Sequence, residues 1–168
     1  MDSTLLEFRN ADHSEADKLA LVLERANAER DGISLPTVLE NDQTIGYIQE
    51  RMSRIDARTQ VAIYGRKIIG FAISHPLIDP ENYSEDTDTE HLSLLMIDPD
   101  YWGRRIASRL LDITVKHALD TGRSHLTLWT RERDNRRAQA VYEHKGFSLT
   151  GIPKTTKDGR QVHYQLDL

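Results

Sequence analysis

One stretch near the middle of the chain combines residue types that suit the binding of an anion. An apolar run over residues 91–97 predicts a buried strand, Pro99 ends it, and apolar residues at helical spacing begin at Ile106. A strand that passes directly into a helix leaves the first N–H groups of that helix open at the positive end of its dipole, where phosphates bind. The small residues Gly103 and Ala107 would let a phosphate approach the main chain. An ordinary helix start beside a tight turn has the same pattern, so both interpretations stay open.

A second segment, residues 126–147, forms a pair with the first. It reads LTLWTRERDNRRAQAVYEHKGF, and the pattern N-x-x-A-x-x-x-Y-x-x-x-G-F runs from Asn135 to Phe147. The first segment carries P-x-x-x-G-x-x-I-A-x-x-L-L from Pro99 to Leu111. In this order and at this separation, the two patterns resemble the GNAT superfamily of acyl-CoA-dependent N-acyltransferases.

The resemblance implies both a fold and a reaction. The fold is a GNAT-like acyl-CoA N-acyltransferase fold of the α/β class, an α+β mixed sheet of about seven mostly antiparallel strands with helices on both faces. The reaction moves an acetyl group from acetyl-CoA, as co-substrate and without a metal, to an amine. Such a transfer needs a deprotonated amine, a polarised thioester carbonyl and a proton for the departing thiolate.

The resemblance assigns the coenzyme's phosphates to the main chain of one loop and helix start. The residues of this stretch are Gly103, Arg104, Arg105, Ile106, Ala107 and Ser108. The family usually has Gln/Arg-x-x-Gly-x-Gly/Ala here, whereas this chain has Trp102, Arg105 and Ala107 at those places. A left-handed backbone would be costly at Arg105, although its guanidinium could add a contact to a pyrophosphate. No role for Trp102 follows from the sequence.

The resemblance also implies roles for main-chain groups of the strand and for two residues of the second segment. An N–H near Leu95 would polarise the thioester carbonyl, and the adjoining Met96 and Ile97 would hold the pantetheine arm. Asn135 would begin a helix and meet the pantetheine or the neighbouring loop. Tyr142 would lie near the coenzyme sulfur and protonate the thiolate. The alternative for Tyr142 is a structural tyrosine that packs beside Phe147.

The base that takes the proton from the amine has three candidates. The resemblance favours a side chain at the start of the same strand, where this chain has Glu90 and His91. Histidine suits this task because its ordinary pKa, about 6.5, lies near working pH. Strand alternation predicts His91, Ser93 and Leu95 on one face and Glu90 on the other, unless a bulge shifts the register. Ordered water is the third candidate, and a solvated His91 without a catalytic role stays open.

Charged side chains gather in two further segments. The arginines at positions 131, 133, 136 and 137 could screen the coenzyme's 3′-phosphate or simply face water. Residues 79–90 read DPENYSEDTDTE, contain no Lys or Arg, and are too polar for a core. Because charge of one sign attracts the opposite sign, this loop predicts a cationic amine such as a polyamine, an aminoglycoside or a basic peptide end. A solvated loop is the alternative.

Periodicity predicts the elements that must position these groups. A capping box of Ser14 with Asp17 begins a helix that ends before Gly32. Along the whole chain, the expected order is strand, two helices, three strands, helix, strand, helix and two strands. Their expected positions are a short strand near 5–8, a second helix near 45–55, strands at 59–65, 67–77 and 91–97, a helix at 106–118, a strand near 126–128, a helix after 135, and strands at 147–149 and 162–168.

The composition narrows the class of protein. A length of 168 residues fits one domain, 1–168, which at this size buries roughly 70% of its unfolded surface. A net charge of −5 argues against nucleic acid as a partner. The chain has no Cys, which excludes disulfides and thiolate nucleophiles. No apolar run approaches the roughly 20 residues of a membrane span, and the first residues are not a secretory signal, so we expect a cytoplasmic protein without a membrane partner.

We therefore expect an N-acetyltransferase whose amine acceptor attacks the thioester directly in a ternary complex. Two alternatives stay open. One is a non-catalytic acyl-CoA-binding regulatory module, suggested by the unusual Arg105 and the unassigned base. The other is an acetyltransferase acting on a protein N-terminus, so the acceptor is a small-molecule or peptide amine. Many relatives pair through a sheet edge or a helix face, which leaves a homodimer open.

Overall fold

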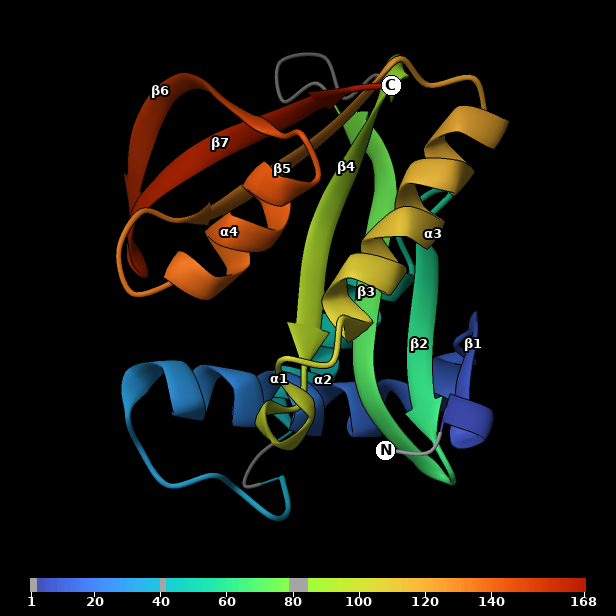
Figure 1. Cartoon of the computed structure of the whole chain (residues 1–168), viewed down its shortest axis with the longest axis vertical. Coiled ribbons are helices and arrows are strands. Elements are labelled where there is room, and N and C mark those ends of the chain that lie inside the picture. The colour runs from blue at the N-terminus through green and yellow to red at the C-terminus, as the bar shows by residue number, and fades with distance from the viewer. Residues whose placement is uncertain (1–2, 40–41, 79–84) are drawn as a thin grey trace.

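The computed structural model describes residues 3–39, 42–78 and 85–168. In this part of the chain, seven strands form one sheet in the order β1-β2-β3-β4-β5-β7-β6 (Figure 1). Neighbouring strands are antiparallel except for the parallel pair β4–β5, which confirms the expected mixed sheet. The strands are β1 (Leu6–Asn10), β2 (Arg58–Tyr64), β3 (Lys67–Ile78), β4 (Glu85–Ile97), β5 (His125–Arg131), β6 (Ser148–Thr156) and β7 (Gly159–Asp167).

Four α-helices in the described ranges flank the sheet on both faces. They are α1 (Ala16–Asp31), α2 (Gln43–Met52), α3 (Ile106–Asp120) and α4 (Arg136–His144). Short 3-10 turns precede β1, α1 and α3, namely η1 (Ser3–Leu5), η2 (His13–Glu15) and η3 (Pro99–Tyr101). The chain order of strands and α-helices is the expected one.

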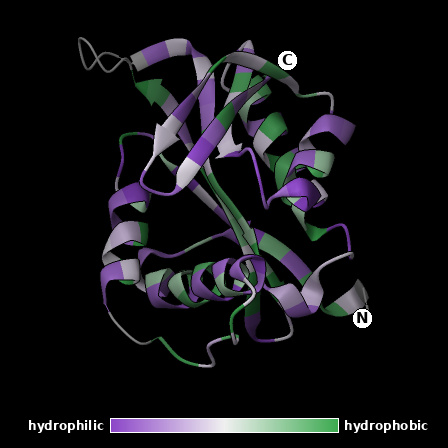
Figure 2. Cartoon of the chain, turned by 90° about the vertical axis from the view of Figure 1, so that its left-hand side faces the viewer, coloured by the Kyte–Doolittle hydropathy of each residue, from purple (hydrophilic) through white to green (hydrophobic). Residues whose placement is uncertain are grey.

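Each face of the sheet has its own hydrophobic core. Leu19 of α1 and Ile48 of α2 pack with Phe71 of β3 on one face. Leu110 of α3 packs with Leu128 of β5 on the other face, together with residues of α4. Figure 2 shows hydrophobic stretches along the central strands, between more hydrophilic helix surfaces. Each fully buried side chain of this kind contributes about 2 kcal/mol, so the central strands form a stable frame for the site.

The polar stretch before β4 is the first point where the expectation was wrong. The structure includes 85–90 in β4, and Glu90 is only 1% exposed. Glu90 is tolerated inside because the guanidinium of Arg123 lies 3.8 Å from its carboxylate and because its main chain pairs with both β3 and β5. The first part of the stretch, 79–84, lies outside the described residues.

The capping box before α1 is also displaced from its expected place. Asp12 accepts hydrogen bonds from Ser14, and the Glu15 carboxylate accepts from the Asp12 N–H at 2.9 Å. The box therefore begins η2, one short turn ahead of α1. Arg9 fixes Glu15 further with two hydrogen bonds of 2.8 Å, an ion pair that the spacing of Ser14 and Asp17 could not reveal.

Candidate functional site

A large cleft lies where β4 and β5 separate. The two strands pair only from Thr89–Leu92 to His125–Leu128. Beyond Leu92 the strands diverge, and a cavity of about 1110 Å³ lies between them. Residues from α1, α2, the start of α3, α4 and the β6–β7 hairpin complete its walls. The cleft is therefore reached from both faces of the sheet.

A β-bulge in β4 determines which side chains point to which face. Ile73 of β3 pairs with Leu94, whereas the next residue, Ser74, pairs with Leu92, so Ser93 is the extra residue. Leu92 packs in the core on the α3 face, but Leu94 packs in the core on the α1 face. The expectation that His91, Ser93 and Leu95 share one face is therefore wrong, because the bulge reverses the alternation after Ser93. Leu95 lies on the α3 face.

The helix start predicted to bind phosphate faces this cleft. All six residues from Gly103 to Ser108 line the cavity. Arg105 is the N-cap of α3, and its side chain makes no capping hydrogen bond. The first N–H groups of a helix have no intrahelical acceptor, so this uncapped start offers free donors and a positive dipole end to an anion.

The loop before α3 has an unusual backbone. Gly103 has a φ of 77° and Arg105 a φ of 60°. Glycine adopts this left-handed region freely, but for Arg105 it costs about 1–2 kcal/mol. The strained conformation that the sequence made doubtful is present, so the surrounding structure must hold it.

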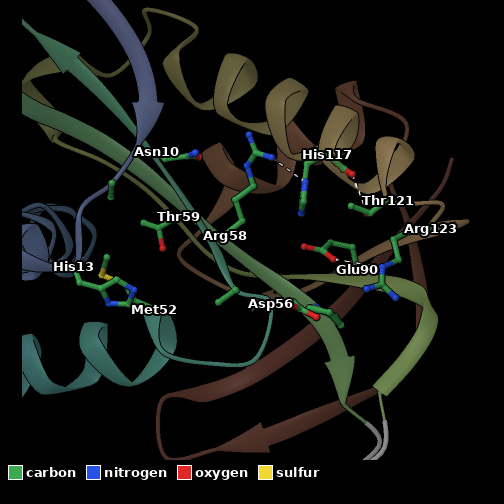
Figure 3. A pocket seen from close by; sticks show the side chains of 13 residues that line it. Asn10, His13, Met52, Asp56, Arg58, Thr59, Glu90, His117, Thr121 and Arg123 are labelled. Carbon is green, nitrogen blue, oxygen red and sulfur yellow. Dashed lines mark hydrogen bonds and ion pairs between the residues drawn. The ribbon is translucent and has the colours of Figure 1, made fainter.

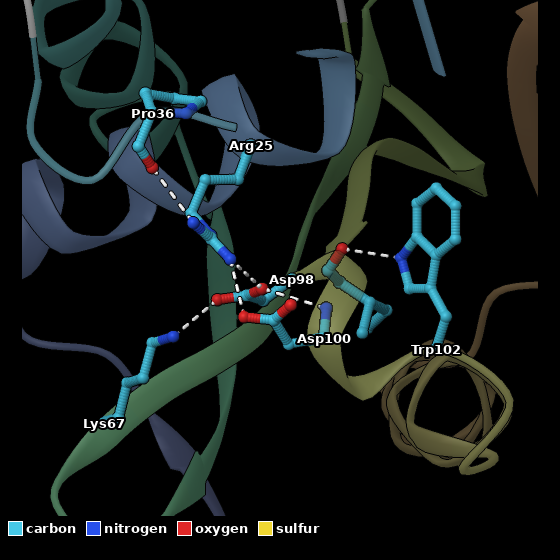
Figure 4. A network of polar contacts seen from close by, with 7 residues as sticks. Arg25, Pro36, Lys67, Asp98, Asp100 and Trp102 are labelled. Atoms are coloured by element: carbon cyan, nitrogen blue, oxygen red, sulfur yellow. Dashed lines mark hydrogen bonds and ion pairs between the residues drawn. The ribbon is translucent and has the colours of Figure 1, made fainter. Parts of the chain in front are cut away.

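A buried ionic network holds the turn that leads into this loop (Figure 4). The fully buried Asp98 accepts hydrogen bonds from Arg25 of α1 at 3.1 Å and Lys67 of β3 at 2.7 Å. Arg25 also donates to Asp100 at 2.7 Å and to the carbonyl of Pro36 at 2.9 Å. Burial raises the pKa of Asp98, but the bonds from Lys67 and Arg25 outweigh burial and lower it below its ordinary value. The network connects α1, β3 and the β4–α3 turn, and the sequence patterns did not predict it.

Trp102 gains a structural role that the sequence did not supply. Its indole N–H donates to the Ile97 carbonyl at 2.8 Å, which satisfies a main-chain acceptor at the open end of β4. The Arg137 guanidinium of α4 lies over the indole, 4.7 Å from its centre. Trp102 therefore forms part of the cleft wall beside the segment of β4 that does not pair with β5. Leu95, Met96 and Ile97 line the cleft beside it.

Tyr142 of α4 lies in the wall of the cleft and in the core at once. Its ring is buried beside Phe147, with centroids 5.9 Å apart, and beside Tyr164 at 6.0 Å. Burial raises the pKa of the Tyr142 hydroxyl well above its usual range, so the phenol keeps its proton at neutral pH. The packing role and a position on the cleft are therefore compatible.

Asn135 differs from its expected local role. It occupies the N-cap of α4, but its side chain makes no capping bond and instead donates to the Thr130 hydroxyl at 2.7 Å. Gln139 holds the same loop by donating to the carbonyls of Arg131 and Glu132. Asn135 still lines the cleft, where it connects the end of β5 to the start of α4.

The two candidate bases lie in different places. His91 lines the large cleft. Its Nδ1 lies 3.1 Å from the Thr127 hydroxyl, which donates in turn to the Glu90 carbonyl at 3.5 Å. This order makes His91 Nδ1 the donor and leaves Nε2 as an acceptor. Burial, and then the nearby charges of His75, His163, Lys154 and Arg54, lower the pKa of His91 to about 3.

Glu90 borders a second, smaller cavity of about 470 Å³ (Figure 3). His117 of α3 and Arg58 of β2, joined by a 2.9 Å contact between Nη1 and Nδ1, line the same cavity. Glu90 is absent from the described residues that line the large cleft. In this geometry the Glu90 carboxylate does not reach an acceptor in the large cleft.

The two charged segments also differ in whether their residues line the large cleft. Among the four arginines of the second segment, Arg131 and Arg137 line the cleft, but Arg133 and Arg136 do not. No described residue of the acidic stretch, 85–90, lines it either. The argument for a cationic acceptor from that stretch therefore has no support in the cleft wall.

The described part of the chain has neither a metal-binding cluster nor a membrane-spanning helix. Residues 3–39, 42–78 and 85–168 contain no group of three or more His, Asp and Glu side chains able to hold a metal ion. In the same ranges no helix is long and apolar enough to cross a membrane.

Together, the separated strands β4 and β5 and the uncapped helix start that faces them form a cleft able to accept an elongated anionic ligand. The model of the Acetyltransferase (GNAT) family matches residues 4–147. The chain therefore belongs to the GNAT family, whose enzymes take acetyl-CoA as co-substrate. No curated protein matches it.

Solved structures with the same fold cover nearly the whole chain. A GNAT acetyltransferase from Desulfovibrio desulfuricans is 21% identical with a TM-score of 0.74, over 96% of this chain and 98% of that one. An acetyltransferase from Salmonella typhimurium, solved with acetyl-CoA, is 15% identical with a TM-score of 0.72, over 97% and 94%. The ribosomal-protein-S18-alanine N-acetyltransferase from Escherichia coli is 18% identical with a TM-score of 0.73, over 96% and 93%. At these low sequence identities, the structural similarity establishes the fold alone.

Proposed function

We propose that the protein is an N-acetyltransferase that moves the acetyl group of acetyl-CoA to a primary amine by direct attack in a ternary complex. The observation that carries the proposal is the uncapped start of α3, which faces the cleft between β4 and β5. A similar fold from Salmonella typhimurium was solved with acetyl-CoA. Because the chain has no Cys, a cysteine thioester intermediate is impossible.

The residues present fit the coenzyme. The main-chain N–H groups of Ile106, Ala107 and Ser108 would hold the pyrophosphate, and Arg104 and Arg105 would add charge. A Cβ built at Gly103 meets nothing within 4 Å, so the main chain there is open to a close ligand. The cleft volume of about 1110 Å³ is ample for such a ligand. Leu95, Met96 and Ile97 would flank the pantetheine arm.

The coenzyme supplies an acetyl thioester. Two groups of the chain would act on it, and a third would hold the adjoining loop. A main-chain N–H near Leu95 would stabilise the negative charge that develops on the acyl oxygen. Tyr142, which keeps its proton at neutral pH, would donate that proton to the departing sulfur. The side chain of Asn135 would hold the loop that closes the cleft beside the arm.

The proton of the amine would leave through water, with His91 orienting the amine. A group with a pKa of about 3 is too weak a base to hold a proton at neutral pH. Nε2 of the neutral ring can still accept a hydrogen bond from the amine. The positive charges around His91 would also favour the neutral form of an incoming amine.

An acceptor screen tests the proposed activity. The purified chain is mixed with acetyl-CoA and a panel of primary amines, including peptides with free N-termini, and release of free coenzyme A thiol is followed. We expect thiol release that depends on the amine, and an amine heavier by one acetyl group. Coenzyme binding by calorimetry without thiol release from any amine would instead favour a non-catalytic acyl-CoA-binding module.

Single-turnover mixing tests direct transfer. The chain is mixed with acetyl-CoA alone, and its intact mass is measured. We expect no acetylated protein that can pass its acetyl group to a later amine. A competent acetyl-enzyme would show that the transfer proceeds in two covalent steps.

A further inference from the structure

The cleft carries an excess of positive charge that the coenzyme's phosphates do not explain. Its wall contains nine Arg and Lys side chains but only three Asp and Glu side chains. Arg104, Arg105 and Arg137 lie at the α3 and α4 end, where the phosphates would bind. Arg51 comes instead from α2, and Arg54 lies just after the end of this helix at Met52. Helix α2 packs on the other face of the sheet through the core that contains Ile48. This second group of cations needs a different explanation.

The residues around His91 show how this second group is arranged. Arg54 donates from Nη1 to His75 Nε2 at 2.9 Å, because His75 Nδ1–H is engaged by the Pro76 carbonyl at 2.7 Å. The rings of His75 and His91 lie 5.5 Å apart. Arg54, just after the end of α2, therefore reaches the part of the cleft that His91 faces.

Lys154 of β6 approaches the same part of the cleft from another wall. Its ammonium lies 3.8 Å from the centre of the Trp129 ring, and that ring packs on His163 at 4.9 Å. Both Lys154 and Arg54 act electrostatically on His91. Within the described part of the chain, Lys154 forms no ion pair with a carboxylate, and burial lowers the pKa of its ammonium. A cation without a counter-ion favours the binding of an anion.

Carboxylates near these cations offset only part of their charge. The Glu50 carboxylate forms ion pairs with both Arg51, at 3.0 Å, and Arg54, at 2.9 Å, and its side chain is half exposed. Glu24 of α1 also lines the cleft, where it accepts from the Thr44 hydroxyl. Lys154 adds a positive charge that neither carboxylate meets in an ion pair. This end of the cleft therefore stays positive.

We propose that the acceptor amine also carries an anionic group, a carboxylate or a phosphate, and that this group binds between Arg54 and Lys154 beside His91. The proposal rests on the proposed function and narrows its acceptor to small amphoteric amines such as amino acids. It differs from the cationic acceptor that the acidic stretch predicts, because polyamines would meet like charge in this part of the cleft.

Matched acceptor pairs test the proposal. The pairs are an amino acid with its amide, and phosphoethanolamine with ethanolamine, and spermidine serves as the polyamine. Each is measured for thiol release and, independently of turnover, for calorimetric binding to the chain loaded with coenzyme A. We expect the anionic member of one pair to bind at least about tenfold more tightly than its neutral partner. Which pair shows the preference distinguishes carboxylate from phosphate.

Variants then connect the preference to the two cations. Lys154→Met should raise the KM and Kd of the anionic acceptor about tenfold and leave those of its neutral partner and of acetyl-CoA unchanged. Arg54→Gln should act in the same direction. Lys116→Met is the control, because Lys116 is 74% exposed on α3 and pairs with Asp120. It should change nothing.

Four results would overturn the proposal, and the first three concern acceptor preference. The first is that the protein acetylates the neutral and the anionic member of each pair equally well. The second is that it prefers spermidine, and the third is that the Lys154→Met variant still prefers the anionic member. Failure of every acceptor to bind the loaded protein would also overturn it. Failure of the chain to bind acetyl-CoA at all would instead remove the proposed function, so the two failures can be told apart.

Discussion

The two ends of the cleft present different parts of the protein to a ligand. At the α3 end, these are main-chain amides, and a network around the buried Asp98 holds the turn that presents them. At the α2 and β6 end, the groups are the side chains of Arg54 and Lys154, which reach the cleft from separate elements. Almost every residue has a main-chain N–H, so the donors at the α3 end depend on the backbone conformation. The cations at the other end depend on which residues stand at positions 54 and 154.

The largest effect should come from breaking the network behind the α3 end. Asp98→Ala leaves the mostly buried Arg25 with a weaker set of partners, and loss of one partner of a buried pair costs about 3–5 kcal/mol. Urea denaturation should show a loss of unfolding free energy near this range, with weaker binding of acetyl-CoA. Asp100→Ala is the control, because Asp100 is 61% exposed and its loss should cost less than about 1 kcal/mol. Equal losses in the two variants would contradict the importance of the buried network.

The second-largest effect should come from removing the hydroxyl of Tyr142, which lines the cleft between its two ends. Tyr142→Phe keeps the ring contacts with Phe147 and Tyr164 but removes the proton donor. Stopped-flow or steady-state assays should show kcat reduced by about 100-fold, with the KM for acetyl-CoA unchanged. An unchanged kcat would mean that Tyr142 only packs.

A smaller effect tests whether the α3 end works through its backbone. Arg105→Gly should relieve the left-handed strain and raise the unfolding free energy by about 1 kcal/mol. If main-chain amides carry most of the affinity, calorimetry should find acetyl-CoA binding within about threefold of the original. A loss of about 100-fold would show instead that the guanidinium is the principal contact.

The smallest effect should come from His91 at the acceptor end. Burial lowers the pKa of His91 to about 3. The ring is then neutral at pH values well above 3, and it does not titrate between pH 5 and 8. His91→Gln, which keeps a hydrogen-bond acceptor, should change kcat by less than about tenfold and leave the pH profile of kcat/KM the same. An acid limb near pH 6.5 that disappears in His91→Gln would restore His91 as the base.

The sequence revealed the backbone-dependent end better than the side-chain-dependent end. Two local patterns carried the resemblance to the GNAT family, and the resemblance implied that Gly103–Ser108 and Tyr142 face the coenzyme. Both line the cleft. Asp98 could have been suspected from its place before Pro99, where it caps η3. Its partner Arg25 lies 73 residues away, and no local pattern specifies such a pair.

The acceptor end of the cleft could not be predicted from the sequence, for similar reasons. The bulge at Ser93 reverses the faces of β4, and alternation alone cannot reveal an extra residue. Arg54 and Lys154 are 100 positions apart in the sequence, and only the packing of α2 and the β6–β7 hairpin around β4 brings them to one cavity. The acidic stretch looked more informative because its charges are contiguous, yet its described residues lie elsewhere.

A crystal structure of the protein grown with acetyl-CoA tests the central claim most directly. The account predicts pyrophosphate oxygens about 3 Å from the main-chain nitrogens of Ile106, Ala107 and Ser108, with the thioester near Tyr142. Acetyl-CoA bound elsewhere on the molecule, or a cleft that excludes it, would contradict the account.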